Sequence, residues 1–311
     1  MTRSAWVFPG QGSQALGMLA DLAAAFPVVQ ATFAEASDAL GKDLWQLAQQ
    51  GPETELNATE NTQPLLLTGG IAVWRAWHEA GGRAPDCLAG HSLGEYTALV
   101  AAGTLSLAVG VRLVAVRVRL MQAAVPAGEG AMAAILGLED AQVIAACAEA
   151  AQGEVVSAVN FNAPGQVVIA GASAAVERAI VLLKAAGAKR ALPLPVSAPS
   201  HCALMRPAAE QLAERLAALT LNAPVIPVVQ NADAAVAADL DALRDALVRQ
   251  LYSPVRWVEC VQQLSASGVT RFVESGPGKV LTGLNKRIAK EAEHYSVETA
   301  ESIRAALDAV C

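Results

Sequence analysis

The segment Gly90-His91-Ser92-Leu93-Gly94 constrains the fold more strongly than any other part of this 311-residue sequence. It is a G-x-S-x-G motif that follows the short apolar segment 87–89 and precedes a helical pattern starting at Gly94. Such a strand-to-helix turn exposes the serine oxygen, because both glycines relieve crowding, and the N–H after the serine can face an oxyanion. The alternative is an ordinary serine in a glycine-flanked turn. The flanking strand and helix favour Ser92 as a nucleophile in an α/β fold.

Strand-like and helical patterns alternate on both sides of this motif. Residues 4–8 predict a strand that stops at Pro9-Gly10, and Ala/Leu-rich helical patterns fill residues 16–80 with breaks at Gly41 and Gly51-Pro52. Strands joined by helices predict a mostly parallel sheet with helices on both faces. Helical patterns cover residues 94–124, and further strands are expected over 225–229 and 271–274. Further helices are expected over 208–219, 239–251 and 279–289, and the helix over 279–289 is expected to be the last one.

The middle of the chain has a different order of elements. Strand-like segments cover 132–138, 155–159, 167–170 and 190–196, and helical patterns cover 139–151 and 173–186. Residues 160–165 are rich in turn-forming types, and Ser173 is expected to be an N-cap. The order β-α-β-β-α-β is the ferredoxin-like pattern. We therefore expect residues 126–197 to form a ferredoxin-like domain inserted into a core made of residues 1–125 and 198–311.

Composition excludes several classes of protein. The chain is 54% hydrophobic and only 16% charged, which indicates buried helices and strands rather than disorder. A net charge of −7 argues against a general nucleic-acid binder. The five cysteines form no C-x-x-C pair, and the uncharged run 96–111 is too short and too glycine-interrupted to cross a membrane. With no signal-peptide pattern at the start, we expect a cytoplasmic protein without a metal or bound cofactor.

A nucleophilic serine needs a base, and the sequence holds four histidines. His91 adjoins Ser92 and should point away from it, whereas His78 and His294 lie in segments that read as solvated. His201 lies in a loop after a predicted strand, where α/β folds place catalytic groups. No downstream carboxylate stands out as its partner, so a backbone carbonyl could orient the ring. A loop histidine that only packs is the alternative.

Arg117 is the next candidate, because it lies on the apolar stripe of its predicted helix. Leu113, Arg117, Leu120 and Met121 share one face at i, i+3 and i+4 spacing. A buried arginine is costly unless it is paired, and its planar fork suits a carboxylate. An internal salt bridge and a substrate carboxylate are both compatible with this spacing.

The N-terminal loop Phe8–Ala15 has two interpretations. Gly10, Gly12 and Ala15 match the G-x-G-x-x-A dinucleotide pattern, but the stretch 26–28 holds Phe, Pro and Val where a ribose-binding acid would be expected. The alternative is a loop whose backbone N–H at Gln11 completes an oxyanion hole with a donor from elsewhere in the fold.

Several motifs together carry a resemblance to a known family. They occur in the order FPGQGSQ at 8–14, GHSLGEY at 90–96, Arg117 in its helix, NAPGQVVIAG at 162–171, PSHCALM at 199–205, QLYSPVRW at 250–257 and ESGPGKVL at 274–281. The chain resembles the malonyl-CoA:acyl carrier protein transacylases, the stand-alone enzymes of bacterial fatty acid synthesis. The resemblance covers nearly the whole chain, and the ordered set is far more specific than any one motif.

The resemblance implies an α/β-hydrolase-like core with an inserted ferredoxin-like domain. It also implies ping-pong chemistry, in which malonyl-CoA acylates Ser92 and the phosphopantetheine thiol of acyl carrier protein takes the malonyl group, with His201 as the base. The other implied site residues are Gln11 and Leu93 as backbone donors of an oxyanion hole, Arg117 for the malonyl carboxylate, Gln250 through its carbonyl as the orienter of His201, and Gln63 as a lining residue.

Selectivity and docking residues also follow from this comparison. Ser200 fills the place where malonyl-selective polyketide acyltransferase domains commonly carry Phe, and Ser is normal in the stand-alone enzymes. Because this chain and carrier proteins are both acidic, docking needs local basic clusters. The candidates for binding carrier protein or CoA phosphates are Lys189-Arg190 and Lys286-Arg287 with Lys290. Scattered solubilising charge is the alternative.

Other functions remain open from the sequence alone. A serine hydrolase, such as a thioesterase or esterase, would share Ser92 and His201 but would leave Arg117 unexplained. A polyketide-pathway acyltransferase would use the same residues. A silent carrier-binding module is disfavoured by the intact Ser92, His201 and Arg117. We expect malonyl-CoA and acyl carrier protein as partners, no nucleic acid or membrane, and a monomer.

Overall fold

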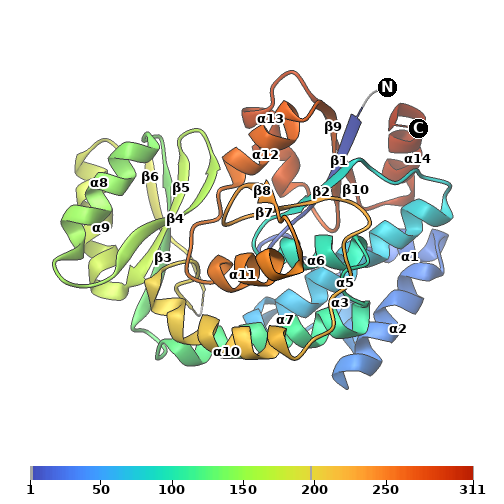
Figure 1. Ribbon diagram of the computed structural model, residues 1–311, viewed down its shortest axis with the longest axis horizontal. Helices are drawn as coiled ribbons and strands as arrows, with labels where there is room; N and C mark the ends of the chain where they lie inside the picture. Colours follow the sequence, from blue (N-terminus) through green and yellow to red (C-terminus); the bar gives the residue numbers. More distant parts are fainter. Residues whose placement is uncertain (1–2, 197, 311) are drawn as a thin grey trace.

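A six-stranded sheet, here called sheet A, forms the centre of the protein (Figure 1). The structure is a computed structural model that describes residues 3–196 and 198–310. The predicted domain boundaries at residues 1, 197 and 311 lie outside these residues. The strands of sheet A, in spatial order, are β10 (Glu293–Val297), β9 (Val269–Ser275), β1 (Arg3–Phe8), β2 (Cys87–Gly90), β7 (Val228–Gln230) and β8 (Ala235–Val236).

All neighbouring pairs in sheet A are parallel except β7 and β8. Strand β1 lies in the middle, and its side chains alternate between two apolar layers. Trp6 and Phe8 belong to the larger layer, whereas Ala5 and Val7 belong to the smaller one. A parallel strand buried on both faces is typical of α/β proteins. The predicted α/β fold with a mostly parallel sheet is confirmed.

Helices cover both faces of sheet A. The larger apolar layer packs against helices from the first half of the chain and α10, and the smaller layer packs against α12 and α13. None of the helices within the described residues is long and apolar enough to cross a membrane. The helices outside the middle region are α1 (Ala20–Ala25), α2 (Val28–Leu40), α3 (Leu44–Gln50), α4 (Glu53–Asn57), α5 (Thr59–Glu79), α6 (Leu93–Ala101), α7 (Leu107–Ala124), α10 (Arg206–Ala217), α11 (Leu240–Gln250), α12 (Trp257–Ala266), α13 (Val280–Ile288) and α14 (Ala300–Val310).

The middle region forms a separate antiparallel sheet, here called sheet B, at the left of Figure 1. Its strand order is β4-β5-β3-β6, and helices α8 and α9 pack on one face. The Val255 N–H donates to the Val159 carbonyl at 2.8 Å and ties sheet B to the chain beside sheet A. The elements are β3 (Gly130–Leu136), α8 (Asp140–Ala151), β4 (Val156–Ala163), β5 (Gln166–Ala172), α9 (Ser173–Ala185) and β6 (Arg190–Pro193).

Two expectations for this region were wrong. Most of the segment predicted as turn, 160–165, is strand: β4 runs to Ala163 and β5 starts at Gln166, so only Pro164-Gly165 turns. The two strands pair from one end to the other with two register shifts, and that pairing overrides the local turn preference. The N-cap of α9 is Ala172 rather than Ser173, whose hydroxyl instead donates to the Gly128 carbonyl at 2.7 Å.

The C-terminal expectation was also wrong, because α13 is not the final helix. Strand β10 and helix α14 follow it. His294, expected to be solvated, lies in β10 with its ring stacked on Phe272 at a centroid distance of 5.4 Å. The charged residues around it misled the prediction, because β10 is an edge strand of sheet A and edge strands commonly carry charge.

Candidate active site

Ser92 stands at the turn between β2 and α6 in a strained backbone conformation. Its φ is 53° and its ψ is −106°, and its N–H donates to the Asn231 side-chain oxygen at 2.7 Å. The flanking glycines are required by close approach. A Cβ at Gly90 would lie 1.9 Å from the Gly94 backbone, and a Cβ at Gly94 would lie 2.0 Å from the Phe8 carbonyl oxygen. The strand, turn and helix therefore pack too closely for any other residue at these two positions.

The Ser92 hydroxyl meets the imidazole of His201. The distance from Oγ to Nε2 is 2.7 Å, and Nδ1 of the same ring lies 2.7 Å from the backbone carbonyl oxygen of Gln250. Because a carbonyl only accepts, Nδ1 carries the proton and leaves Nε2 to accept from the serine. Burial, and then the positive charge of Arg117, lower the pKa of His201 to about 3. The ring is therefore neutral near pH 7 and aligned to accept a proton from Ser92.

Arg117 on α7 is fully buried beside the same hydroxyl. Its Nη1 donates to Gln63 Oε1 at 2.7 Å, and its Nη2 donates to Gln250 Oε1 at 3.1 Å and to Ser92 Oγ at 3.4 Å. No Asp or Glu within residues 3–196 and 198–310 forms a salt bridge with it. A buried cation held only by neutral groups leaves room for an anionic ligand at this point.

A cavity of about 140 Å³ opens onto these groups. The predicted residues that line it are Gln11, Gln63, Ser92, Leu93, Ser200 and His201. The backbone N–H groups of Gln11 and Leu93 have no hydrogen-bond partner in the described part of the chain. Two unpaired donors beside a serine hydroxyl match the requirement for stabilising an oxyanion.

Sheet B contributes a wall of the cavity that the sequence did not reveal. Met132 comes from β3, Asn160 from β4, and Leu194 and Val196 from the segment after β6. The side-chain oxygen of Asn160 is buried without a partner among the described residues. The turn-like composition of 160–165 concealed Asn160, since a strand register is needed to aim its side chain. The sequence analysis also missed Asn231, which accepts from the Ser92 N–H, and Glu95, which accepts from the Asn231 N–H.

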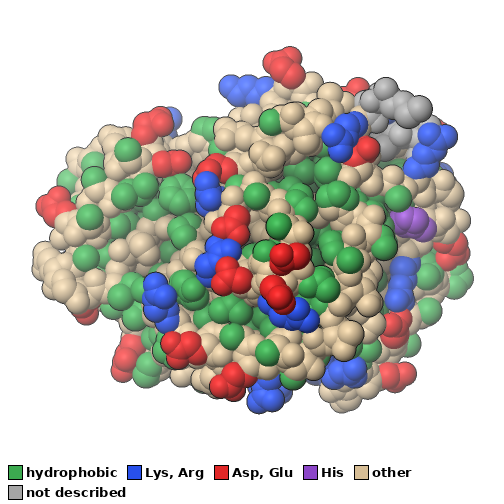
Figure 2. Space-filling view, in the orientation of Figure 1, with side chains coloured by type: hydrophobic (Ala, Val, Ile, Leu, Met, Phe, Trp, Pro, Cys, Tyr) green, Lys and Arg blue, Asp and Glu red, His purple; other side chains and the backbone are tan. Residues whose placement is uncertain are grey.

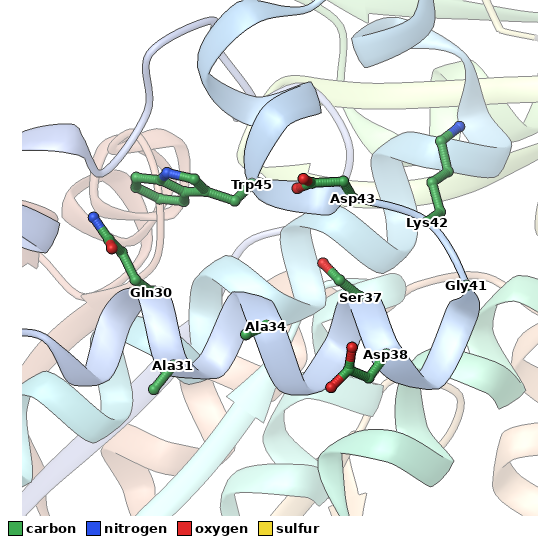
Figure 3. Close-up of a pocket in the computed structure, with 9 residues that line it drawn as sticks. All are labelled: Gln30, Ala31, Ala34, Ser37, Asp38, Gly41, Lys42, Asp43 and Trp45. Atoms are coloured by element: carbon green, nitrogen blue, oxygen red, sulfur yellow. The ribbon is translucent and has the colours of Figure 1, made fainter.

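A larger cavity lies elsewhere and has different chemistry. It measures about 800 Å³ and lies between α2 and α3 (Figure 3). Two of its polar side chains already hold the local backbone: Ser37 Oγ accepts from the Leu44 N–H at 3.0 Å and joins the two helices, and Asp43 Oδ1 caps α3 by accepting from the Gln46 N–H at 2.8 Å. It shares no lining residue with the smaller cavity. The smaller cavity is therefore the candidate active site.

The candidate docking residues lie on two surfaces. Lys189 and Arg190 are exposed at the start of β6, and Lys286 and Arg287 are exposed on α13. Arg287 donates to Gln166 Oε1 at 2.6 Å and to the Pro164 carbonyl, so it also links α13 to the turn between β4 and β5. Acidic and basic side chains are interspersed over the face drawn in Figure 2. Within the described residues, no cluster of His, Cys, Asp or Glu could hold a metal ion.

Comparison with known proteins decides the family. Residues 5–304 match the family described as the acyl transferase domain. The chain belongs to this family. It is 60% identical over 308 residues to the malonyl CoA-acyl carrier protein transacylase of Escherichia coli K12, which covers 99% of this chain and 100% of that protein. The resemblance drawn from the ordered sequence motifs is thereby confirmed.

Solved structures agree with this placement. One is an acyl carrier protein S-malonyltransferase from Vibrio cholerae, with 62% identity, a TM-score of 0.95, and coverage of 98% of this chain and 99% of that one. Another is a malonyl-transacylase in complex with its type II PKS acyl-carrier protein. It has 58% identity, a TM-score of 0.97, and coverage of 99% of this chain and 100% of that one.

Proposed function

We propose that this chain transfers a malonyl group from malonyl-CoA to the phosphopantetheine thiol of acyl carrier protein, and so supplies the extender unit for fatty acid synthesis. One observation carries the proposal: the buried guanidinium of Arg117 reaches the hydroxyl of Ser92, which also faces His201. A serine and a base fit any acyl transfer, but a buried cation at the reacting oxygen fits an acyl group that bears a carboxylate. Relatives named for this reaction support the substrate.

The first half-reaction follows from the arrangement of the side chains. Ser92 Oγ attacks the thioester carbon while His201 Nε2 takes its proton, and the N–H groups of Gln11 and Leu93 stabilise the oxyanion. The C–S bond then breaks, and His201 returns the proton to the CoA sulfur. Arg117 binds the malonyl carboxylate and is itself held by Gln63. The product is a malonyl ester on Ser92.

The second half-reaction repeats these steps with another thiol. His201 takes the proton of the phosphopantetheine thiol, the sulfur attacks the ester carbon, and Ser92 recovers its proton as the oxygen leaves. The carbonyl of Gln250 keeps the imidazole in one tautomer throughout. Ser200 lines the acyl cavity and, being small, sets little limit on branched acyl groups.

Sheet B and the basic residues complete the proposal. We infer that residues 126–197 are a ferredoxin-like domain inserted into an α/β-hydrolase-like core, which the order β-α-β-β-α-β and the strand order β4-β5-β3-β6 support. Lys189, Arg190, Lys286 and Arg287 are proposed to meet the carrier protein or CoA phosphates. The cytoplasmic location and the monomeric state stay predictions.

Intact mass spectrometry tests the reaction directly. The protein is mixed briefly with malonyl-CoA, and holo acyl carrier protein is then added, with Ser92→Ala as the control. A malonyl adduct that moves to the carrier is expected in the native protein and no adduct in the variant. An adduct lost as free malonate without any carrier would instead establish a hydrolase. No adduct in the folded protein would overturn the proposal. Fatty acid and polyketide carrier proteins, tested side by side, separate the two pathways.

A further inference from the structure

Glu95 is a buried carboxylate that the proposed reaction does not use. It lies in the first turn of α6, and its side chain is fully enclosed. One oxygen, Oε2, accepts from the Asn231 N–H at 2.8 Å and from Gln250 Nε2 at 2.9 Å. No Lys, Arg or His forms an ion pair with it within the described residues. Burying a carboxyl group without an ion pair is costly, so its presence beside the site calls for a reason.

Gln250, the first contact of Glu95, forms hydrogen bonds with all three of the proposed reacting or binding residues. Its backbone carbonyl accepts from His201, and its side-chain oxygen accepts from Arg117 at 3.1 Å. Its side-chain nitrogen donates to the Ser92 carbonyl at 3.0 Å as well as to Glu95. The orientation of one amide therefore decides whether Arg117 and Ser92 are both held.

The chemistry of the two ends leaves that amide only one orientation. A guanidinium only donates hydrogen bonds, whereas an amide has one end that donates and one end that accepts. Glu95 Oε2, which also accepts from the Asn231 N–H, presents an acceptor to Gln250. With Arg117 on one side and Glu95 on the other, the oxygen of Gln250 must face Arg117 and its nitrogen must face Glu95. A reversed amide would set donor against donor and acceptor against acceptor.

The second contact of Glu95, Asn231, holds the serine turn. Its backbone N–H donates to Glu95, its side-chain oxygen accepts from the Ser92 N–H at 2.7 Å, and its side-chain nitrogen donates to the Gly90 carbonyl at 2.7 Å. The same carboxylate thus anchors both residues that fix the strained backbone of Ser92. This backbone keeps its conformation only while its surroundings hold it.

We propose that Glu95 is a positioning residue, whose accepting oxygen Oε2 orients Gln250 and anchors Asn231 and thereby aligns Arg117 with Ser92 for acyl groups that bear a carboxylate. This inference rests on the proposed function and deepens it. Glu95 touches neither substrate nor reacting atom, so it acts only through its two partners. Its loss is expected to affect malonyl transfer more than acetyl transfer, because only malonyl uses Arg117.

Glu95→Gln tests this with little change of shape, since an amide at position 95 can donate as well as accept and need not accept from Gln250. Glu274→Gln is the matched control: Glu274 is also buried and accepts two backbone N–H groups, from Leu281 at 3.0 Å and Thr282 at 2.6 Å, away from the cavity. For both variants, kcat and KM are measured with malonyl-CoA and acetyl-CoA, together with the urea unfolding midpoint.

The malonyl-to-acetyl ratio of kcat/KM is expected to fall about tenfold in Glu95→Gln, the scale of one hydrogen bond to a charged group. The ratio should stay at the native value in Glu274→Gln, even where both variants lose similar stability. A folded Glu95→Gln protein with the native ratio, or with equal losses for both substrates, would overturn the inference.

A second variant keeps the inference open to refutation if Glu95→Gln does not fold. Gln250→Leu retains the backbone carbonyl that accepts from His201 but removes the amide that Glu95 orients. The same fall in the ratio is expected, and an unchanged ratio would overturn the inference. Failure of the proposed function is separate: in that case the native protein itself transfers no malonyl group.

Discussion

Arg117 Nη2 lies 3.4 Å from Ser92 Oγ, although the arginine comes from the middle of α7 and the serine from the turn before α6. The guanidinium is fully buried and otherwise bound to Gln63 and Gln250. A cation at this place favours an anionic acyl group over a neutral one of similar size. The selectivity of the enzyme should therefore depend on this one side chain.

Arg117→Ala is expected to lower kcat/KM for malonyl-CoA by about 10- to 100-fold, the value of one hydrogen bond to a charged group. Acetyl-CoA has no carboxylate, so its kcat/KM should change little. Steady-state kinetics with both donors measure the ratio. Arg112→Ala, an exposed arginine on the same helix, is the control and should leave both values as they are. An unchanged preference for malonyl-CoA in Arg117→Ala would show that Arg117 does not bind the malonyl carboxylate.

The pH dependence of stability should report the neutral state of His201. Burial and Arg117 lower its pKa to about 3, against 6.5 for the free imidazole. Between these values the unfolded chain binds a proton that the folded chain does not, so stability falls as the pH falls through this window. From pH 7 to pH 5 this one group should cost about 2 kcal/mol of unfolding free energy.

His201→Gln isolates this contribution. Burial raises the pKa of Glu95 to about 7, so Glu95 contributes more to the free energy of unfolding as the pH falls from 7 to 5. This contribution is the same in the native protein and in the variant. The free energy of unfolding, measured with urea at pH 7 and pH 5, should therefore change less unfavourably towards acid in the variant than in the native protein. Identical losses would mean that His201 takes up its proton in the folded state as readily as in the unfolded chain.

Ser92, His201 and Arg117 could each be predicted from a local sequence pattern. The first stands between two glycines, the second follows a predicted strand, and the third breaks an apolar stripe of period 3.6. No such pattern marks the amides that hold them. Asn231 reaches Ser92 across 139 positions, and the Gln250 side chain reaches it across 158. Contacts at this separation follow from the packing of sheet A against its helices, which periodicity does not specify.

The strands and helices also divide into those that the local sequence predicts and those that depend on the rest of the fold. Strands β1 and β2 are short apolar runs bounded by Gly or Pro and could be predicted, whereas β10 and α14 could not. The segment around β10 is charged because it forms the sheet edge, and an edge position is decided by the arrangement of the other strands. The paired strands β4 and β5 likewise override a turn-rich composition.

Lys286→Glu is expected to raise KM for acyl carrier protein about threefold at low salt, because an exposed charge steers an acidic partner mainly when screening is weak. The effect should shrink at high salt, and kcat should stay the same. Arg215→Glu on α10 is the control, since Figure 1 places α10 and α13 on opposite sides of the molecule. Arg287 is a poorer test, because it also binds Gln166 and Pro164. An unchanged KM at low salt would exclude Lys286 from the docking surface.

Gly94→Ala should destabilise the protein by at least about 2 kcal/mol, because its Cβ would lie 2.0 Å from the Phe8 carbonyl oxygen and the strand cannot move without disturbing sheet A. Gly283→Ala is the matched control within another helix, where an added Cβ meets nothing within 4 Å. There alanine should stabilise by about 0.5–1 kcal/mol, since it restricts the unfolded chain. Urea unfolding of both variants measures the contrast. Equal stabilities would mean that the approach of β1 to α6 is not what reserves position 94 for glycine.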